Sequence, residues 1–219
     1  MREVRFKCFV IMPFAPELHY FYLYLKQYIE RKYGIQCDRG DADVSTRPLL
    51  DKINEYIQAA DVIIADCSGR NPNVFYELGI AHAYNKRVIL ITKDPVQEAP
   101  TDIRFYEFIH YELERHTEFF DKLDNALFNV FMERYEDLYE RGKTLFYEFR
   151  QQTHAHVELI SKRIFLLRVM PAEQSQELPV LDSDSEVREF ILPHIITDVA
   201  DITTLNQITD WLEKKRNTL

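Results

Sequence analysis

This sequence has few cysteines and no long apolar run, and these two shortages exclude several classes of protein. The three cysteines, Cys8, Cys37 and Cys67, are widely spaced among 219 residues, and no CxxC pair occurs. We therefore expect reduced thiols in the cytoplasm rather than a disulfide framework. No run approaches the roughly 20 apolar residues that a membrane-spanning helix needs. The basic and apolar N-terminus reads as a strand, because no small-residue cleavage site follows it.

Charge and histidine spacing exclude further partners. The net charge of −9 argues against direct contact with nucleic acid or with an anionic membrane. The seven histidines and three cysteines show no metal-ligand spacing, so we expect neither a metal nor a cofactor. A small anionic ligand held by one or two arginines is compatible with this composition.

Short β-rich runs alternate with helical patterns over the first 135 residues. Apolar residues recurring every three or four positions predict helices at 16–33, 48–59, 72–85 and 117–135. Apolar and β-branched runs predict strands at 3–12, 35–38, 61–66 and 87–92, with a fifth near 105–111. This alternation is typical of an α/β domain with a doubly wound parallel sheet of about five strands.

The character of the chain changes near residue 135. Residues 135–170 are helical by pattern and rich in charged and aromatic side chains, with a mild interruption at Gly142. Residues 171–186 read as a polar loop, and 186–219 as one or two more helices. We therefore predict an α/β domain over residues 1–134 and a helical C-terminal extension over 135–219. The extension would regulate the domain, or form a homo-oligomer or a contact with a partner protein.

In an open parallel sheet, ligands bind beyond the carboxyl ends of the strands. That rule selects residues 13–14, 39–43, 66–73 and 92–102. The third segment has Asp66 at the end of a buried strand, Asn71 as a helix N-cap and Pro72 in the first helical position. Glu77 follows in the second turn, and Gly79 beside it would let a ligand or the sheet approach closely.

Two carboxylates that converge on one cavity are the arrangement that glycosyl transfer needs. One acid attacks or stabilises an oxocarbenium-like sugar, while a second group handles the leaving group or water. In the alternative, both residues have only structural roles: Glu77 interacts favourably with the helix dipole, and Asp66 caps a turn. Burial would raise the pKa of Glu77 and the helix N-terminus would lower it, and the sequence does not decide between them.

Four ordered blocks within residues 5–111 resemble the nucleoside 2-deoxyribosyltransferase-like group, which is related in fold to TIR-type domains. The blocks are CFVIMPF, RGDAD, ADVIIADCSGRNPNVFYELGIAHAYNKRVILIT and TDIR. The resemblance implies a flavodoxin-like sheet, an N-glycosidic substrate and Glu77 as the catalytic acid. It also implies three sets of substrate contacts: Met12, Pro13 and Phe14 after the first strand, Arg39 and Asp41 after the second, and Asp66, Ser68 and Asn71 after the third.

One position departs from the family. The transferases carry an aspartate six residues before the catalytic glutamate, whereas this chain has Asn71, and an amide is no general acid. A nicotinamide leaving group is already cationic and needs no proton, so the substitution favours NAD-like or nucleotide substrates. Arg39, Arg70 and Arg104 are expected in rim loops, where a guanidinium can grip phosphate; salt-bridged surface arginines are the alternative. Asn73, in the same rim segment, is a further candidate for substrate contact.

The leading hypothesis is an enzyme that cleaves or transfers at an N-glycosidic bond, with NAD or another nucleotide as substrate rather than cofactor. Glu77 carries the chemistry, Asp66, Ser68 and Asn71 position the ribose, and Arg39 and Arg70 receive phosphate. By analogy of fold, the protein would be a bacterial anti-phage defence effector that is inactive until assembled. The alternatives are a non-catalytic nucleotide-binding or signalling module of the same fold, and a housekeeping nucleoside 2-deoxyribosyltransferase, against which Asn71 counts.

Overall fold

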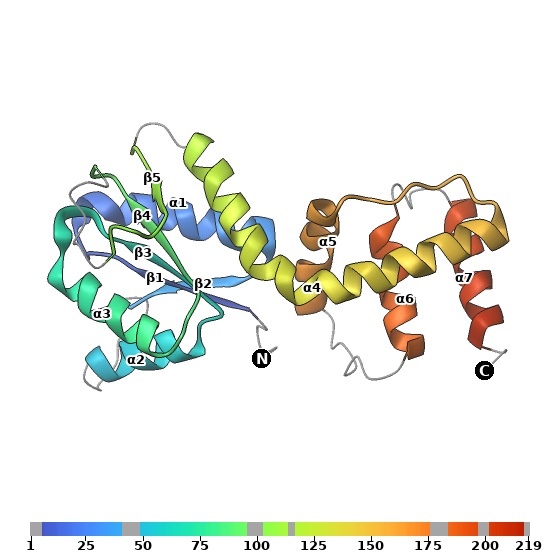
Figure 1. The fold of residues 1–219 in the computed structure, drawn as a ribbon, viewed down its shortest axis with the longest axis horizontal. Helices are drawn as coiled ribbons and strands as arrows, with labels where there is room; N and C mark the ends of the chain where they lie inside the picture. Colours follow the sequence, from blue (N-terminus) through green and yellow to red (C-terminus); the bar gives the residue numbers. More distant parts are fainter. Residues whose placement is uncertain are drawn as a thin grey trace. The chain divides into compact units, whose positions relative to one another are not determined.

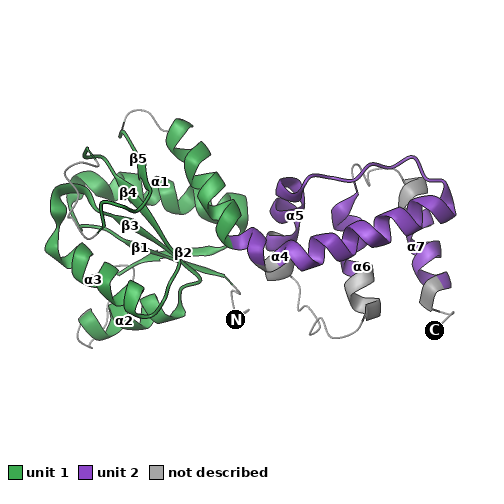
Figure 2. Ribbon diagram, viewed as in Figure 1, with its two compact units in different colours: residues 1–130 green, residues 131–219 purple. Residues whose placement is uncertain are grey.

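The computed structural model describes residues 6–40, 49–95, 103–113, 117–175, 184–196 and 202–216. The chain divides into two compact units, residues 1–130 and 131–219 (Figure 2). The division falls within one long helix, α4 (Thr117–Thr153). In their described parts, the first unit contains a β-sheet with its helices, and the second is built mainly of helices.

Five strands form one parallel sheet in the order β2-β1-β3-β4-β5. They are β1 (Lys7–Ile11), β2 (Gln36–Arg39), β3 (Val62–Asp66), β4 (Val88–Thr92) and β5 (Phe108–His110). The predicted α/β class and five-stranded parallel sheet are confirmed. The strand order reverses between β1 and β3, so the carboxyl ends of these two strands meet at the switch point where such sheets bind ligands.

Helices cover both faces of this sheet (Figure 1). On one face lie α2 (Leu49–Ala59) and α3 (Pro72–Ala83), whose Ile57 and Leu78 belong to a core that includes Phe9, Ile63 and Leu90 of the strands. The other face is covered by α1 (Pro16–Tyr33) and the start of α4. Because both faces are covered, β3 is buried along its whole length and reads as a continuous apolar run up to Asp66.

A buried carboxylate ties α1 to α4. Asp124 of α4 is 2% exposed and accepts hydrogen bonds from the Tyr28 and Tyr33 hydroxyls of α1 at 2.9 and 2.8 Å. The Lys32 ammonium also donates to this carboxylate. A buried charge is costly unless it is paired and hydrogen-bonded, so this cluster favours one position of α4 on α1.

The outer edge of β2 carries side chains from α1. The Cys37 backbone N–H donates to Glu30 at 3.2 Å, and the Cys37 carbonyl accepts from the Lys26 ammonium at 2.5 Å. Lys26 and Glu30 are themselves an ion pair at 3.2 Å. Gln36 directs its N–H to Phe6 beside β1, so Cys37 faces the opposite way, and both of its backbone groups are satisfied.

The second unit contains the rest of α4 together with α5 (Lys162–Ser175), α6 (Asp184–Ile195) and α7 (Ile202–Arg216). The helix expected at 117–135 does not end there, because α4 continues through Gly142 for 37 residues in all. A Cβ at Gly142 would lie 2.3 Å from Ile191 and 2.7 Å from Ile195 of α6. Glycine therefore serves close packing of the two helices rather than an interruption.

Two further findings concern the lengths and the apolarity of the helices. The prediction of a loop from residue 171 was wrong at its start, because α5 extends to Ser175. Across the ranges that the structure describes, no helix combines the length and apolarity needed to span a bilayer.

Candidate functional site

Helix α3 begins at the carboxyl edge of the sheet, just after β3. Asn71 is its N-cap: the side-chain oxygen accepts from the backbone N–H groups of Asn73 at 2.9 Å and Val74 at 3.4 Å. Pro72 follows in the first turn, where its missing N–H costs nothing. The predicted cap is confirmed. Because its oxygen is engaged by the backbone, the Asn71 amide is held in a fixed orientation.

Glu77 lies in the second turn of α3 and is half-buried. Burial raises the pKa of its carboxyl to about 7, and no charged side chain contributes to the shift. Burial therefore outweighs the helix N-terminus, the balance that the sequence left open. The physical reason is position: the favourable field of a helix N-terminus is largely confined to the first turn, and Glu77 lies beyond it.

Tyr84, the C-cap residue of α3, links this helix to α2. It lies seven residues after Glu77, a spacing that brings two positions to the same side of a helix. The Tyr84 hydroxyl accepts a hydrogen bond from the Gln58 amide of α2 at 3.0 Å. Residues 41–48, which connect β2 to α2, lie outside the described residues, and the predicted substrate contact Asp41 is among them.

Asp66 is fully buried, and each of its carboxylate oxygens has a donor. One oxygen accepts from the Ser68 backbone N–H at 3.0 Å and from the Ser68 hydroxyl at 2.5 Å. The other accepts from the Tyr111 hydroxyl at 2.8 Å. Burial raises the pKa of Asp66, and these hydrogen bonds oppose the rise. In this arrangement Asp66 holds the loop that leads into α3.

The end of β4 also supports that loop. The Lys93 backbone N–H donates to the Ser68 hydroxyl at 2.9 Å, and the Gly69 N–H donates to the Asp94 carboxylate at 2.5 Å. Gly69 has φ of 65°, which glycine adopts without penalty, and Arg70 has φ of 50°. A left-handed conformation costs an arginine roughly 1–2 kcal/mol, so the loop holds Arg70 in a strained but defined position.

Arg39 lies at the carboxyl end of β2 but is only 3% exposed. Its guanidinium lies over the Tyr22 ring at 4.3 Å and over the Phe14 ring at 5.3 Å, measured to the ring centroids. Phe14 itself is 51% exposed, so it covers the arginine from the solvent side. The prediction placed Arg39 in a rim loop; the structure instead encloses it between two aromatic rings at the end of the strand, because α1 supplies Tyr22.

The remaining candidates differ in exposure. Met12 is buried and Pro13 half-buried after β1, whereas Arg70, Asn73 and Arg104 are exposed. The structure thus places Asp66 and the loop that leads into α3 beside the segment that follows β1, and Glu77 in the second turn of that helix.

Three other expectations from the sequence can be compared with the structure. A Cβ at Gly79 would have no protein atom within 4 Å, so the prediction that the sheet approaches this glycine closely was wrong, and approach by a ligand stays a prediction. Cys67 is buried, and burial raises the pKa of its thiol to about 12, so it packs, as predicted, rather than reacts. His82 stacks on Tyr106 at 5.5 Å, on the opposite flank of α3 from Glu77.

Tyr111, which completes the hydrogen bonding of Asp66, is not among the residues predicted from the sequence. A signal was available: Tyr111 directly follows β5, so the carboxyl-edge rule applies to it as it does to the loops after β1, β3 and β4. The short apolar run around it gave no hint that its hydroxyl reaches back to β3.

Two cavities open elsewhere on the first unit, and Glu77 lines neither. One, of about 490 Å³, is bordered by β4, β5 and α4, and the other, of about 300 Å³, by β1, β2 and α2. Within the described ranges of the chain, no group of three or more His, Cys, Asp or Glu side chains could hold a metal ion.

No protein-family model matches the chain, and no curated protein matches it. Among solved structures, it is similar to a 2-desoxiribosyltransferase from Leishmania mexicana, with 22% identity and a TM-score of 0.37; the match covers 41% of this chain and 65% of that one. It is also similar to the CMP N-glycosidase BcmB of Clostridium botulinum, with 23% identity and a TM-score of 0.43, over 54% of this chain and 97% of that one. The chain thus spans slightly less than two thirds of the transferase, and these likenesses are distant similarities of fold to a deoxyribosyltransferase and a nucleotide N-glycosidase.

Proposed function

We propose that this protein cleaves or transfers at the N-glycosidic bond of a nucleotide, with Glu77 as the catalytic carboxylate. One observation carries the proposal: burial raises the pKa of this carboxyl to about 7, in a helix that begins at the switch-point edge of a parallel sheet. A carboxyl whose pKa is raised to about 7 by burial is uncommon on a surface helix and is typical of catalytic sites.

In the proposed reaction, the ionised form of Glu77 acts on the sugar. As the bond from the anomeric carbon to the base breaks, positive charge develops on that carbon and the ring oxygen. A half-buried carboxylate stabilises this charge, or bonds to the carbon, more strongly than one fully in water would. A cationic leaving group such as nicotinamide departs without a proton, so no second acid is needed on that side.

Asn71 supports this choice of substrate. Its side-chain oxygen accepts from two backbone N–H groups at the start of α3, and an amide cannot protonate a departing base. NAD-like substrates therefore fit better than the neutral bases that a housekeeping deoxyribosyltransferase exchanges.

We assign the other residues by their exposure. Buried Asp66, with Ser68 and Tyr111, positions the loop, and Arg39 positions Phe14 for contact with the nucleoside. Exposed Arg70 and Asn73 supply the polar contacts to ribose and phosphate. A role in anti-phage defence, and assembly through the second unit, stay predictions from the sequence resemblance.

The test is turnover by the full chain. Purified protein is incubated with NAD, with nucleoside monophosphates, and with a deoxynucleoside plus a free base, and the products are separated by liquid chromatography. Released nicotinamide or free base is expected, and Glu77→Gln should slow its release by at least about 100-fold. Glu213→Gln, an exposed glutamate on α7, is the matched control and should retain full activity.

Two outcomes would reject the proposal. One is a Glu77→Gln variant that turns over as fast as the unmodified chain. The other is nucleotide binding that both proteins share and that yields no product, which would assign the chain to the non-catalytic binding class.

A further inference from the structure

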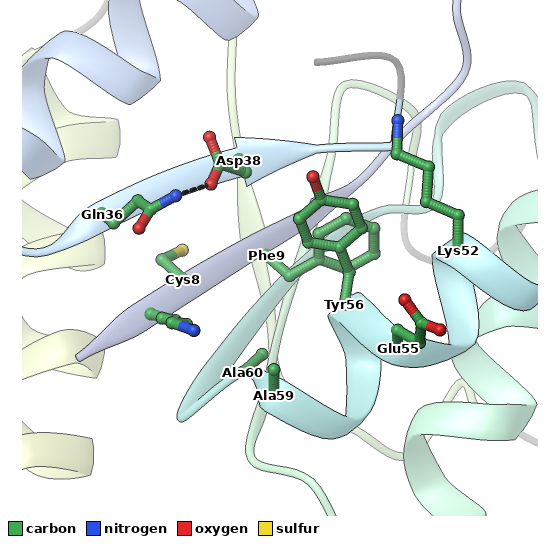
Figure 3. A pocket seen from close by; sticks show the side chains of 10 residues that line it. Cys8, Phe9, Gln36, Asp38, Lys52, Glu55, Tyr56, Ala59 and Ala60 are labelled. Atoms are coloured by element: carbon green, nitrogen blue, oxygen red, sulfur yellow. Dashed lines mark hydrogen bonds between the residues drawn. The ribbon is translucent and has the colours of Figure 1, made fainter. Parts of the chain in front are cut away.

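The smaller cavity of the first unit is a consequence of the width of the sheet. In register, Gln36 and Asp38 of β2 stand opposite Lys7 and Phe9 of β1, so all four side chains point to the face that α2 covers. Helix α2 packs over β1 and leaves Gln36 exposed and Asp38 half-buried on the edge strand. The uncovered strip forms one wall of a hollow of about 300 Å³, within the range of small-molecule sites (Figure 3).

One wall of this hollow is apolar and rigid. The Phe9 and Tyr56 rings are stacked, with centroids 5.3 Å apart and planes 5° apart, and the wall continues with Ala59 at the end of α2 and Ala60 directly after it. Phe9 is buried in the core, which fixes the ring against which Tyr56 packs. A flat wall with small residues beside it accommodates a planar ring and requires no rearrangement to do so.

The opposite wall is rich in hydrogen-bond acceptors. The Gln36 amide nitrogen donates to Asp38, which turns the amide oxygen of Gln36 away from the carboxylate (Figure 3). Asp38 receives this bond on one oxygen and the Lys26 ammonium, at 3.0 Å, on the other. A carboxylate oxygen can accept more than one hydrogen bond, so this wall still offers acceptors to a ligand edge that carries N–H donors.

The charges around the hollow balance. Lys7 and Lys52 contribute two ammonium groups, while Asp38 and Glu55 contribute two carboxylates. A neutral ligand that is polar along one edge therefore suits this lining better than an anion or a cation does.

We propose that this hollow between α2 and the β2 edge is a second ligand site, which takes a planar heteroaromatic ring with an exocyclic amino group. The ring lies along the Tyr56 and Ala59 wall, and the amino group donates to Gln36 and Asp38. Carboxylates read the amino group of cytosine in the same way at nucleic-acid interfaces. None of the candidate catalytic or substrate-contacting residues lines this hollow, so the site is separate from Glu77 and does not depend on the proposed reaction.

The experiment uses the full chain and four probes. Cytosine and adenine carry the amino group, and uracil and hypoxanthine are the matched analogues in which a carbonyl oxygen replaces it. Calorimetry should give dissociation constants of about 0.1–1 mM for an amino base, as expected for a ligand of this size. The keto analogues should bind at least about tenfold more weakly.

Two variants locate the binding. Ala59→Phe fills the hollow from an exposed position, and Gln36→Leu removes the acceptor with little change of shape; each should weaken amino-base binding by at least about tenfold. Gln151→Leu, an exposed glutamine on α4, is the control and should leave it unchanged. A nuclear magnetic resonance titration should shift the backbone amides of β1 and of the second half of α2.

Several results would overturn the proposal. They are no binding of either amino base at 10-fold the expected concentration range, equal binding of the keto analogues, and retained binding in both variants. Shifts centred on Ser68, Gly69 and Asn71 would also overturn it, because they would place the base at the candidate catalytic site instead.

Discussion

The Tyr111 hydroxyl donates to the Asp66 carboxylate at 2.8 Å, although 45 residues separate the two in sequence and both side chains are buried. The bond joins the residue after β5 to the last residue of β3 across the intervening strand β4. It therefore fixes the loop before α3 from the far side of the sheet.

Tyr111→Phe should destabilise the protein by about 1–3 kcal/mol, because it leaves a buried carboxylate oxygen without its donor. The pKa of Asp66 is already raised above its unfolded value, so its contribution to stability is lost as pH rises through the folded pKa. Without Tyr111 that pKa rises further, and the penalty should be larger at pH 8 than at pH 4. Urea unfolding at both pH values measures this, with exposed Tyr20→Phe as the control. Equal stability of Tyr111→Phe and the unmodified chain would contradict the role given to this bond.

Turnover should depend on pH through Glu77. The proposed reaction uses the ionised carboxyl, whose pKa is raised to about 7 by burial. The rate should therefore rise from pH 5 and level off above about pH 7 to 8. Initial rates at saturating substrate across this range provide the measurement. A rate that is constant from pH 5 to 8 would show that another group carries the reaction.

Glu77→Gln should stabilise the protein at high pH while it removes activity. The folded pKa of about 7 exceeds the unfolded value of 4.5, so the native state holds the proton more tightly. The stabilisation from the neutral carboxyl is complete below about pH 4.5 and disappears as pH rises through 7. At pH 8.5 the variant should be more stable than the parent by about 1–2 kcal/mol, a figure reduced for the water that reaches this half-buried group. At pH 4.5 the two melting curves should coincide; a variant that is less stable at pH 8.5 would argue against a desolvated carboxylate.

Two helical glycines should respond to alanine in opposite directions. A Cβ at Gly79 meets no atom within 4 Å, so Gly79→Ala should stabilise α3 by about 0.5–1 kcal/mol. A Cβ at Gly142 would lie 2.3 Å from the buried Ile191, so Gly142→Ala should cost about 1–3 kcal/mol through overpacking. Thermal unfolding of the two variants is the measurement. If Gly79→Ala proves neutral in stability yet inactive, a ligand must approach the helix at that position.

Two substitutions at Asn71 distinguish its role as a helix cap from its effect on the reaction. Asn71→Ala removes the oxygen that two backbone N–H groups share and should cost about 1 kcal/mol. Asn71→Asp keeps the cap and adds a charge that the helix N-terminus favours, so its stability should match the parent. The same variant restores the aspartate of the transferase pattern, and it should gain exchange between a deoxynucleoside and a free base. Exchange by the unmodified chain at the rate of Asn71→Asp would remove the argument that Asn71 selects the substrate.

Local rules accounted for much of this fold and for part of the site. The apolar run before Asp66 predicted a buried strand, and the sequence Asn71-Pro72 predicted the start of α3. Both depend on interactions within a few residues, which periodicity and capping preferences describe well. The position of the candidate site followed from topology alone, since the carboxyl ends of parallel strands share one edge.

What the sequence did not provide depends on long-range packing. The enclosure of Arg39 requires Tyr22 and Phe14 from segments on either side of the start of α1, and the closure of Asp66 requires Tyr111. The pKa of Glu77 depends on the balance between burial and the helix dipole, and the degree of burial follows only from the three-dimensional structure. Gly142 looked like a weak point in a helix, whereas its lack of a Cβ is what α6 requires.

The hydrogen bonds of Lys26 and Glu30 with the backbone of Cys37 affect whether two copies of this protein can associate through the edge of β2. A free border strand invites a second chain to extend the sheet, which is the first step of domain swapping and of fibril growth. Here an incoming strand would have to displace an ammonium and a carboxylate before it could form ladder bonds with Cys37 in β2. Charge reversal at Lys26 should therefore allow the edge of β2 to pair with strands of other copies, and the protein should aggregate on storage before it unfolds.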